Sequence, residues 1–329
     1  MHCPPMPTHP DPICRICGNA TGNQRYSARE MQYGTRELFD YFECAVCGCV
    51  QLEVIPGDLG RFYPTTYFSF RPWRGLSKDP VRRFVDPHRV RRSFGARDWI
   101  GALAEAISHP LSYVDWIKRA GLGADAAVLD VGCGAGKTLI CMALGGFSPC
   151  EGVDPFIEAE LVYDCGVTVH KTSLADFAAT ATRTYDLITF HHSLEHVIDP
   201  LADLKLAKSL LSPGGCIMLG LPVAAYAWAH YRGDWCNLDP PRHIHLLTDD
   251  SMARLAAQAG LRIKDQVCDS NPGQFYGSER NRLDIPAIDR RKPKDLFSAA
   301  QIASFKQQTA QLNAEGRGDL MTYWLEPTG

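Results

Sequence analysis

The glycine loop at residues 128–138 is the feature that most constrains the fold of this chain. It reads V-L-D-V-G-C-G-A-G-K-T, a short apolar run followed by glycines at alternate positions. Such a run predicts a buried parallel strand that turns sharply into a helix, and α/β sheets bind their ligands at the carboxyl ends of strands. We therefore expect an α/β domain built around a ligand-binding loop.

Two familiar nucleotide-binding loops do not match this segment. A phosphate-binding loop has glycine, four residues and then Gly-Lys-Ser/Thr, and its first glycine would fall where this chain has Val131. A dinucleotide-binding loop reads G-x-G-x-x-G, and its third glycine would fall at Lys137. The loop is therefore expected to hold neither a nucleoside triphosphate nor a dinucleotide.

Two acidic residues indicate what the loop holds instead. Asp130 stands at the end of the first strand, and Asp154, in E-G-V-D-P, ends what reads as the next strand. An acidic residue in the second position suits the two hydroxyls of a ribose. Asp130 can accept bonds from an ammonium group, and the amides of a helix start can hold a carboxylate. A ligand with a ribose, an ammonium and a carboxylate but no phosphate is S-adenosylmethionine.

Five segments, taken in their order along the chain, indicate a family resemblance. They are V-L-D-V-G-C-G-A-G (128–136), V-D-P-F (153–156), H-K-T-S-L-A-D-F (170–177), Y-D-L-I-T-F-H-H-S-L-E-H-V-I-D-P (185–200) and L-S-P-G-G-C-I-M-L (211–219). Over roughly residues 95–267 the chain resembles the class I S-adenosylmethionine-dependent methyltransferases. The resemblance implies a methyltransferase with a doubly wound, Rossmann-like α/β sheet of seven strands, one of them reversed near the edge.

The resemblance also implies roles for single residues. Gly132, Gly134 and Gly136 would admit the methionine part of the cofactor, with Asp130 and Cys133 beside it, and Asp154 would bind the ribose. The remaining cofactor contacts implied are Pro155 and Phe156 flanking the adenine, Ser173 and Leu174 at its rim, and His191 where the fourth strand meets the cofactor.

Four cysteines near the N-terminus predict a metal site. The segments C-R-I-C-G and C-A-V-C-G place Cys14, Cys17, Cys44 and Cys47 in two turns that glycine opens. Two such turns supply the four thiolates of a tetrahedral zinc ion, and a closed four-cysteine site leaves no open position for catalysis. We expect a structural Zn²⁺ in a zinc ribbon, with Cys49 as a spare thiol close by.

Charge and hydropathy indicate the cellular location of the protein. The 329 residues carry a net charge of −3, and no apolar run approaches the length that spans a bilayer. We expect a cytoplasmic protein with reduced thiols and no membrane span. The expected division is a flexible tail (1–10), the zinc ribbon (11–60), a linker with N-terminal helices (61–120), the methyltransferase core (121–270) with a lid loop at 225–247, and an extension completing the sheet (271–329).

The proposed lid loop holds the candidate bases. Its segment W-A-H-Y-R-G-D-W-C-N-L-D-P-P-R-H-I-H, residues 228–245, concentrates aromatic and titratable side chains. Removal of a proton from the acceptor is what an oxygen or carbon methyl acceptor requires of the protein. We predict His243 as the general base, with His192 and His245 as the other candidates.

The acceptor is the open question. The order of zinc knuckles, aromatic segment and methyltransferase core resembles methyltransferases of bacterial polysaccharide and nucleotide-sugar biosynthesis. The resemblance implies a small-molecule or glycan acceptor that is methylated on a hydroxyl of a sugar, a nucleotide sugar or a related small molecule, in preference to a carbon of a deoxysugar. Arg242 and the arginines between 82 and 97 would then meet a diphosphate. The simpler interpretation of the arginines between 82 and 97 is a solvated helix face. The alternatives are RNA, which the acidic balance of residues 11–60 argues against, a quinone-type small molecule, and a catalytically silent fold serving as a zinc-ribbon interaction module. Oligomeric state is left open.

Overall fold

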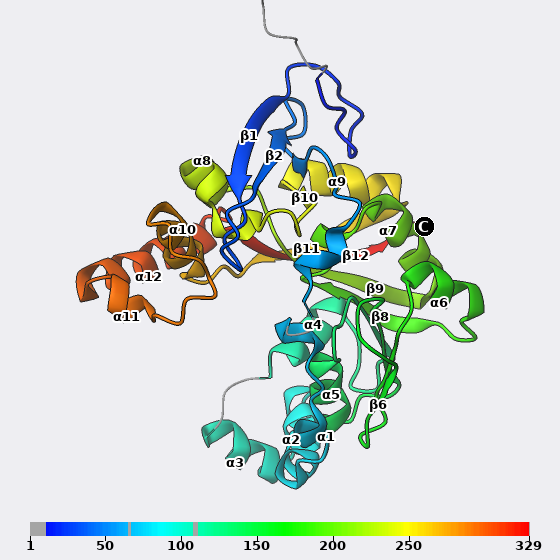
Figure 1. Ribbon diagram of the computed structural model, residues 1–329. Coiled ribbons are helices and arrows are strands. Elements are labelled where there is room, and N and C mark those ends of the chain that lie inside the picture. The colour runs from blue at the N-terminus through cyan, green and yellow to red at the C-terminus, as the bar shows by residue number, and fades with distance from the viewer. Residues whose placement is uncertain (1–10, 65–66, 108–110, 329) are drawn as a thin grey trace, which may run out of the picture. The chain divides into compact units, whose positions relative to one another are not determined.

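The computed structural model describes residues 11–64, 67–107 and 111–328 (Figure 1). The expected flexible tail lies outside these residues. The chain divides into two compact units. Unit 1 contains the described parts of Met1–Leu59, Pro222–Leu255 and Cys268–Asp319, and unit 2 those of Gly60–Leu221, Ala256–Val267 and Leu320–Gly329.

Unit 2 is built on a mostly parallel sheet. Its strands, in spatial order, are β11 (Leu261–Cys268), β12 (Leu320–Pro327), β9 (Leu211–Pro222), β8 (Tyr185–His191), β4 (Val128–Val131), β5 (Cys150–Val153), β7 (Thr168–His170) and β6 (Leu161–Val162). The pairs β4–β5, β5–β7, β4–β8 and β8–β9 are parallel, while β6 runs antiparallel to β7. The doubly wound α/β fold is thus confirmed, and the two-residue strand β6 adds an eighth strand to the seven expected.

The strand order reverses direction at β4, and this positions the ligand loop. From β4 the chain adds β5 and β7 on one side and then β8 and β9 on the other. Such a reversal leaves a crevice outside the carboxyl ends of the two central strands. The glycine loop follows β4 directly, so it lies at this crevice.

The helices of unit 2 begin and end on ordinary signals. Asp79, Ser173 and Asp199 each accept a backbone amide as N-cap residues, and Gly121, with φ of 79°, ends the helix that precedes it. The helices are α1 (Arg74–Ser77), α2 (Pro80–Ser93), α3 (Trp99–Ile107), α4 (Ser112–Ala120), α5 (Lys137–Leu144), α6 (Leu174–Thr180) and α7 (Pro200–Ser209), with 3₁₀ turns η1 (Leu59–Phe62), η2 (Phe68–Phe70) and η3 (Leu194–His196). None of the described helices of the chain is long and apolar enough to cross a bilayer.

Unit 1 is built on a small antiparallel sheet. Its strand order is β1 (Gln24–Arg29), β2 (Leu38–Glu43), β3 (Val50–Leu52) and β10 (His245–Leu246). Around the sheet lie α8 (Tyr226–Tyr231), η4 (Arg232–Asp234), η5 (Cys236–Leu238), α10 (Gly273–Arg282), α11 (Pro293–Leu296), α12 (Ala299–Ala314) and the first part of α9 (Asp249–Gln258).

The units divide the chain differently from the expected segments. Residues 225–247, expected as a lid loop of the core, belong to unit 1 and contain α8, η4, η5 and β10. Strand β10 pairs with β3 of the cysteine-rich segment. Of the expected extension at 271–329, only β12 joins the large sheet, while residues 271–319 belong to unit 1. These memberships rest on pairings between residues about 200 positions apart in sequence, which composition does not reveal.

Candidate functional site

The glycine loop after β4 has a backbone that only glycine adopts easily. Gly132, Gly134 and Gly136 have φ of 72°, 55° and 73°, all in the left-handed region. A Cβ on Gly134 would lie 2.5 Å from the backbone oxygen of Ser69, which also accepts a hydrogen bond from the Ala135 amide at 2.7 Å. The loop is therefore approached closely by the segment containing η2.

Asp154 holds this loop from the next strand. One carboxylate oxygen accepts the Gly134 amide at 2.8 Å, and the other accepts the Phe156 amide at 2.8 Å. The side chain is buried, and burial raises its pKa. A carboxylate offers about four acceptor positions, so these two bonds leave capacity for the hydroxyls of a ribose. The residue thus fits the role that the resemblance implies, although it also has a structural one.

Asp130 is the second buried carboxyl beside the loop. It is 5% exposed and accepts a hydrogen bond from the Thr189 hydroxyl at 2.7 Å. Burial raises its pKa to about 7, against the Thr189 bond, which lowers it. An ammonium group of a ligand would therefore favour the carboxylate form of this side chain.

The raised pKa of Asp130 predicts a pH-dependent stability in the ligand-free protein. Between pH 4 and pH 7 the folded state holds a proton that the unfolded state releases, so the free energy of unfolding falls as the pH rises, by up to about 4 kcal/mol. Asp130→Asn removes this pH-dependent contribution to the free energy of unfolding. Urea unfolding should show that the free energy of unfolding of the wild type exceeds that of the variant by more at pH 5 than at pH 8. An equal difference at the two pH values would contradict the raised pKa of Asp130.

An aromatic segment before α1 covers part of this region, and the sequence reading did not anticipate its contacts. The Tyr63 ring stacks on Phe156, with centroids 5.2 Å apart and an interplanar angle of 7°. The Tyr63 hydroxyl lies 2.9 Å from Nδ1 of His196. The sequence indicated only an aromatic segment between the zinc knuckles and the methyltransferase core. Its partners come from the turn after β5 and from η3, so no local pattern could have named them.

The other predicted cofactor residues have visible structural roles. Ser173 caps α6 through the Asp176 amide, and Leu174 is buried. The Cys133 side chain is directed at Gly152, where an added Cβ would lie 2.4 Å from its sulfur. His191 packs against Trp116 with ring centroids 4.9 Å apart, and burial lowers its pKa to about 4, so the ring is neutral near pH 7. Pro155 follows Asp154 at the end of β5. Contact of these residues with a cofactor stays a prediction.

The four predicted metal ligands come together in unit 1. Their sulfur atoms lie within 4.8 Å of one another, with 3.6 Å between Cys14 and Cys47 and 3.5 Å between Cys17 and Cys44. Sulfur ligands of a tetrahedral zinc ion, each about 2.3 Å from the metal, are about 3.8 Å apart. The four cysteines therefore have the spacing of a four-thiolate site.

The surroundings of the cluster suit thiolates. Gly18 and Gly48 donate their amides to the carbonyls of Cys14 and Cys44 at 2.9 Å, closing the two turns with φ of 77° and 67°. The Gln51 side-chain amide donates to the Cys14 sulfur at 3.0 Å. Donors aimed at sulfur stabilise a negative charge there. The buried Cys49 is outside the cluster of four.

His243 is held in a defined tautomer. Its Nδ1 lies 2.7 Å from the backbone oxygen of Asn237, and since that oxygen only accepts, Nδ1 carries the hydrogen. In the neutral ring, Nε2 then has the lone pair that accepts a proton. Nε2 lies 3.9 Å from a carboxylate oxygen of Asp239. The side chain is 12% exposed.

The other two candidate bases differ in setting. His245 is buried in β10, where it pairs with Gln51 of β3, so it belongs to the interior of the small sheet. His192, in unit 2, has a φ of 56° and a side chain that is 49% exposed, with Nδ1 3.6 Å from Glu195. Its amide donates to the Gly220 backbone oxygen at 2.7 Å, which ties β8 to β9.

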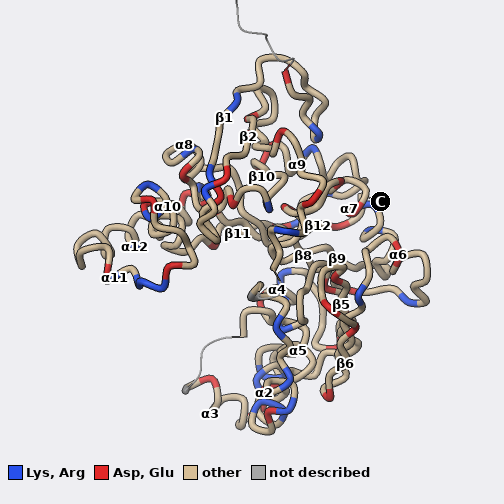
Figure 2. The backbone as a smooth tube through the Cα atoms, in the orientation of Figure 1, with Lys and Arg blue, Asp and Glu red and all other residues tan. Residues whose placement is uncertain are grey.

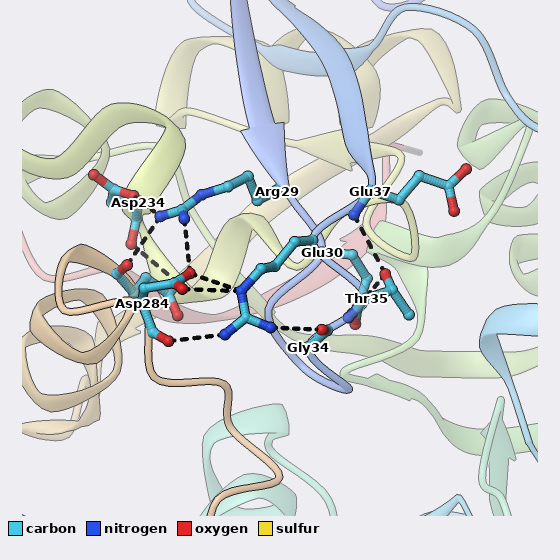
Figure 3. A network of polar contacts seen from close by, with 9 residues as sticks. Arg29, Glu30, Gly34, Thr35, Glu37, Asp234 and Asp284 are labelled. Atoms are coloured by element: carbon cyan, nitrogen blue, oxygen red, sulfur yellow. Dashed lines mark hydrogen bonds and ion pairs between the residues drawn. The ribbon is translucent and has the colours of Figure 1, made fainter.

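Arg242 does not have the setting of a diphosphate ligand. It is fully buried and forms ion pairs with Glu30, at 3.1 Å, and with Asp239. Glu30 also accepts the Tyr33 and Thr35 amides at 2.9 and 3.0 Å, and the neighbouring Arg29 bridges Asp234 and Asp284 (Figure 3). The guanidinium is therefore committed to holding residues 30–35, and the hypothesis that Arg242 meets a diphosphate is not supported.

Comparisons with known proteins agree with this geometry. A family model described as a methyltransferase domain matches residues 104–266. The chain is 32% identical over 167 residues to a ubiquinone biosynthesis O-methyltransferase of Aromatoleum aromaticum, covering 46% of this chain and 70% of the relative. The chain belongs to the class I S-adenosylmethionine-dependent methyltransferases.

Two further proteins are similar to this methyltransferase. A ubiquinone biosynthesis O-methyltransferase of Xanthomonas axonopodis pv. citri is 34% identical over 175 residues, covering 48% of this chain and 70% of the relative. A solved S-adenosylmethionine-dependent methyltransferase from Clostridium acetobutylicum is 12% identical with a TM-score of 0.40, covering 78% of this chain and 97% of that one. Membership makes S-adenosylmethionine the methyl donor. The comparisons do not support the expected likeness to polysaccharide-biosynthesis enzymes.

Proposed function

We propose that this methyltransferase methylates a hydroxyl group of a quinone-type aromatic small molecule. The observation that carries the proposal is the pair of relatives above, both named for O-methylation in ubiquinone biosynthesis and both matched over 70% of their length. This was the alternative acceptor in the sequence reading, and it replaces the sugar hydroxyl as the main one. The cytoplasmic location stays a prediction.

The chemistry of a phenolic acceptor suits the groups present. A phenol has a pKa near 10, so an imidazole can take its proton as the new bond forms. Bound S-adenosylmethionine supplies an electrophilic methyl group. The chain's own tasks are to position the acceptor in line with that methyl group and to remove the proton. We assign the proton to Nε2 of His243, with the Asn237 carbonyl fixing the ring.

We further propose that the four-cysteine cluster holds a structural Zn²⁺. The spacing of the sulfurs, the two glycine turns and the Gln51 donor support it. Four thiolates leave no open coordination position for an acceptor or a water. The metal would stabilise unit 1, and methyl transfer would not pass through it.

Replacement of His243 tests the base. We expect His243→Ala to lower kcat by about 10²- to 10⁴-fold, the usual contribution of a positioned base, while the Kd for S-adenosylmethionine stays unchanged. The measurement is methyl transfer to a phenolic acceptor, with binding followed by calorimetry. His230→Ala, which removes an exposed histidine of α8 in the same unit, is the matched control. A His243→Ala enzyme with full activity would remove His243 from the mechanism.

The acceptor class is tested by a panel. Purified protein, donor and a set of hydroxylated benzoquinols, catechols, nucleotide sugars and glycan fragments would be compared by transfer of labelled methyl. The proposal expects turnover only with the phenolic members. Turnover confined to sugars would reverse the choice of acceptor while leaving the cofactor site intact.

A further inference from the structure

The segment around α2 is strongly basic in an otherwise acidic chain. Residues 71–98 contain nine lysines and arginines against three aspartates, a net charge of +6, whereas the whole chain carries −3. Lys and Arg gather along α2 (Figure 2). A local excess of this size creates a positive potential that the net charge of the molecule conceals.

Ion pairs account for only part of this charge. Asp86 pairs with Arg82 and Arg89, Asp98 with His88 and Arg91, and Glu105 with Arg92. Asp86 and Asp98 are thus each shared between two basic side chains, whereas Asp79 caps α2, and Lys78 pairs with Asp164. Arg83 is exposed on α2, and Arg97 is exposed in the connection between α2 and α3. A positive surface therefore remains after the internal pairs are formed.

The same two helices expose large apolar side chains. Val81 and Phe84 of α2 are 68% and 60% exposed, and Trp99 and Leu103 of α3 are 76% and 62% exposed. Tryptophan is usually among the more buried residues of a folded protein. The two helices are packed on each other, because a Cβ on Gly101 would meet the His88 carbonyl at 2.5 Å. We call these four residues with Arg83 and Arg97 the α2–α3 surface.

The combination of charge and apolar exposure selects a partner. A nucleic acid would satisfy the arginines but leave tryptophan, phenylalanine and leucine in water. A second copy of the chain would oppose two surfaces of the same positive sign. An anionic bilayer surface provides lipid phosphates for the arginines and a region at headgroup depth in which tryptophan is favoured.

We propose that the α2–α3 surface docks this methyltransferase on an anionic lipid bilayer. The arginines contact lipid headgroups, and Trp99, Leu103, Phe84 and Val81 enter the boundary between headgroups and acyl chains. The docking is peripheral and spans nothing. It does not depend on the proposed acceptor, although a quinone-type acceptor with an apolar tail would be found at the same boundary.

Vesicle binding of the full chain tests the proposal. Wild-type protein should co-sediment with phosphatidylcholine vesicles containing 30% phosphatidylglycerol, and much less with pure phosphatidylcholine or in 0.5 M NaCl. The double variants Trp99→Ser/Leu103→Ser and Arg83→Ser/Arg97→Ser should each weaken binding about tenfold or more. Val162→Ser, an equally exposed apolar residue on β6 of the same unit, should bind as the wild type does.

Three results would overturn the proposal. The first is no binding to the anionic vesicles, and the second is equal binding by the wild type and all variants. The third is a concentration-dependent dimer in sedimentation velocity that both double variants abolish, which would assign the surface to contact with a second copy of the chain. S-adenosylmethionine binding by each variant, which should equal that of the wild type, shows that a loss of vesicle binding is not a loss of fold. A phenol-methylating enzyme that ignores vesicles would refute the docking and leave the proposed activity standing.

Discussion

Asp154→Ala is expected to lower the affinity for S-adenosylmethionine by at least about 100-fold. The substitution removes the acceptor of the Gly134 and Phe156 amides, both at 2.8 Å, and the acceptor proposed for the ribose. Each buried donor left without a partner costs about 1–3 kcal/mol, and 100-fold corresponds to about 2.7 kcal/mol. Calorimetric titration of S-adenosylmethionine into wild type and variant measures the change.

Two further variants separate the two roles of this carboxylate. Asp154→Asn keeps one acceptor for the loop amides and should lose less affinity than the alanine variant. Asp164→Ala removes an exposed aspartate that pairs with Lys78 and should leave affinity unchanged. If Asp154→Ala binds the donor as tightly as the wild type, the cofactor site is not where we place it.

Cys47→Ser is expected to abolish zinc binding and to unfold the N-terminal sheet of unit 1. The bound metal should be one ion per chain in the wild type and near zero in the variant. Structural zinc contributes about 10–16 kcal/mol in small peptides at pH 7, so loss of one of four ligands should lower the first thermal transition on the order of 10 °C or more. Metal content by atomic emission and calorimetric unfolding give the two readings.

Cys49→Ala is the matched control for this experiment. Cys49 is buried beside the cluster but is not one of the four grouped sulfurs. This variant should keep one zinc per chain, with at most a small loss of stability from the changed packing. A wild-type protein that contains no zinc after purification in metal-containing medium would contradict the proposed metal, and loss of zinc only on Cys49→Ala would reassign the ligand set.

The features that the sequence predicted well are those set by local backbone requirements. The alternate glycines of the loop after β4 all have positive φ, a requirement that glycine alone meets without strain. Gly121 ends α4 for the same reason. Each Cys-x-x-Cys-Gly turn is defined by five consecutive residues, so both turns could be recognised from the sequence. Their convergence could be predicted because a tetrahedral metal site needs four ligands at one point.

The features that escaped prediction depend on contacts between distant segments. Nothing near Ser69 shows that its carbonyl accepts the Ala135 amide, and nothing near Tyr63 names Phe156 as its stacking partner. Arg242 was expected to meet a diphosphate because the resemblance to nucleotide-sugar biosynthesis enzymes implied an acceptor that carries one. Its burial against Glu30, more than 200 positions away, depends on the sheet that β10 joins.

The position of β12 has a consequence for biosynthesis. This strand follows all other described strands in the chain, yet in the large sheet it lies between β11 and β9. Until residues 320–327 leave the ribosome, β9 and β11 each present an unpaired edge, a configuration prone to pairing with other chains. The methyltransferase sheet can therefore close only after residue 327 has left the ribosome, and a chaperone that shields these edges would increase the yield of folded enzyme.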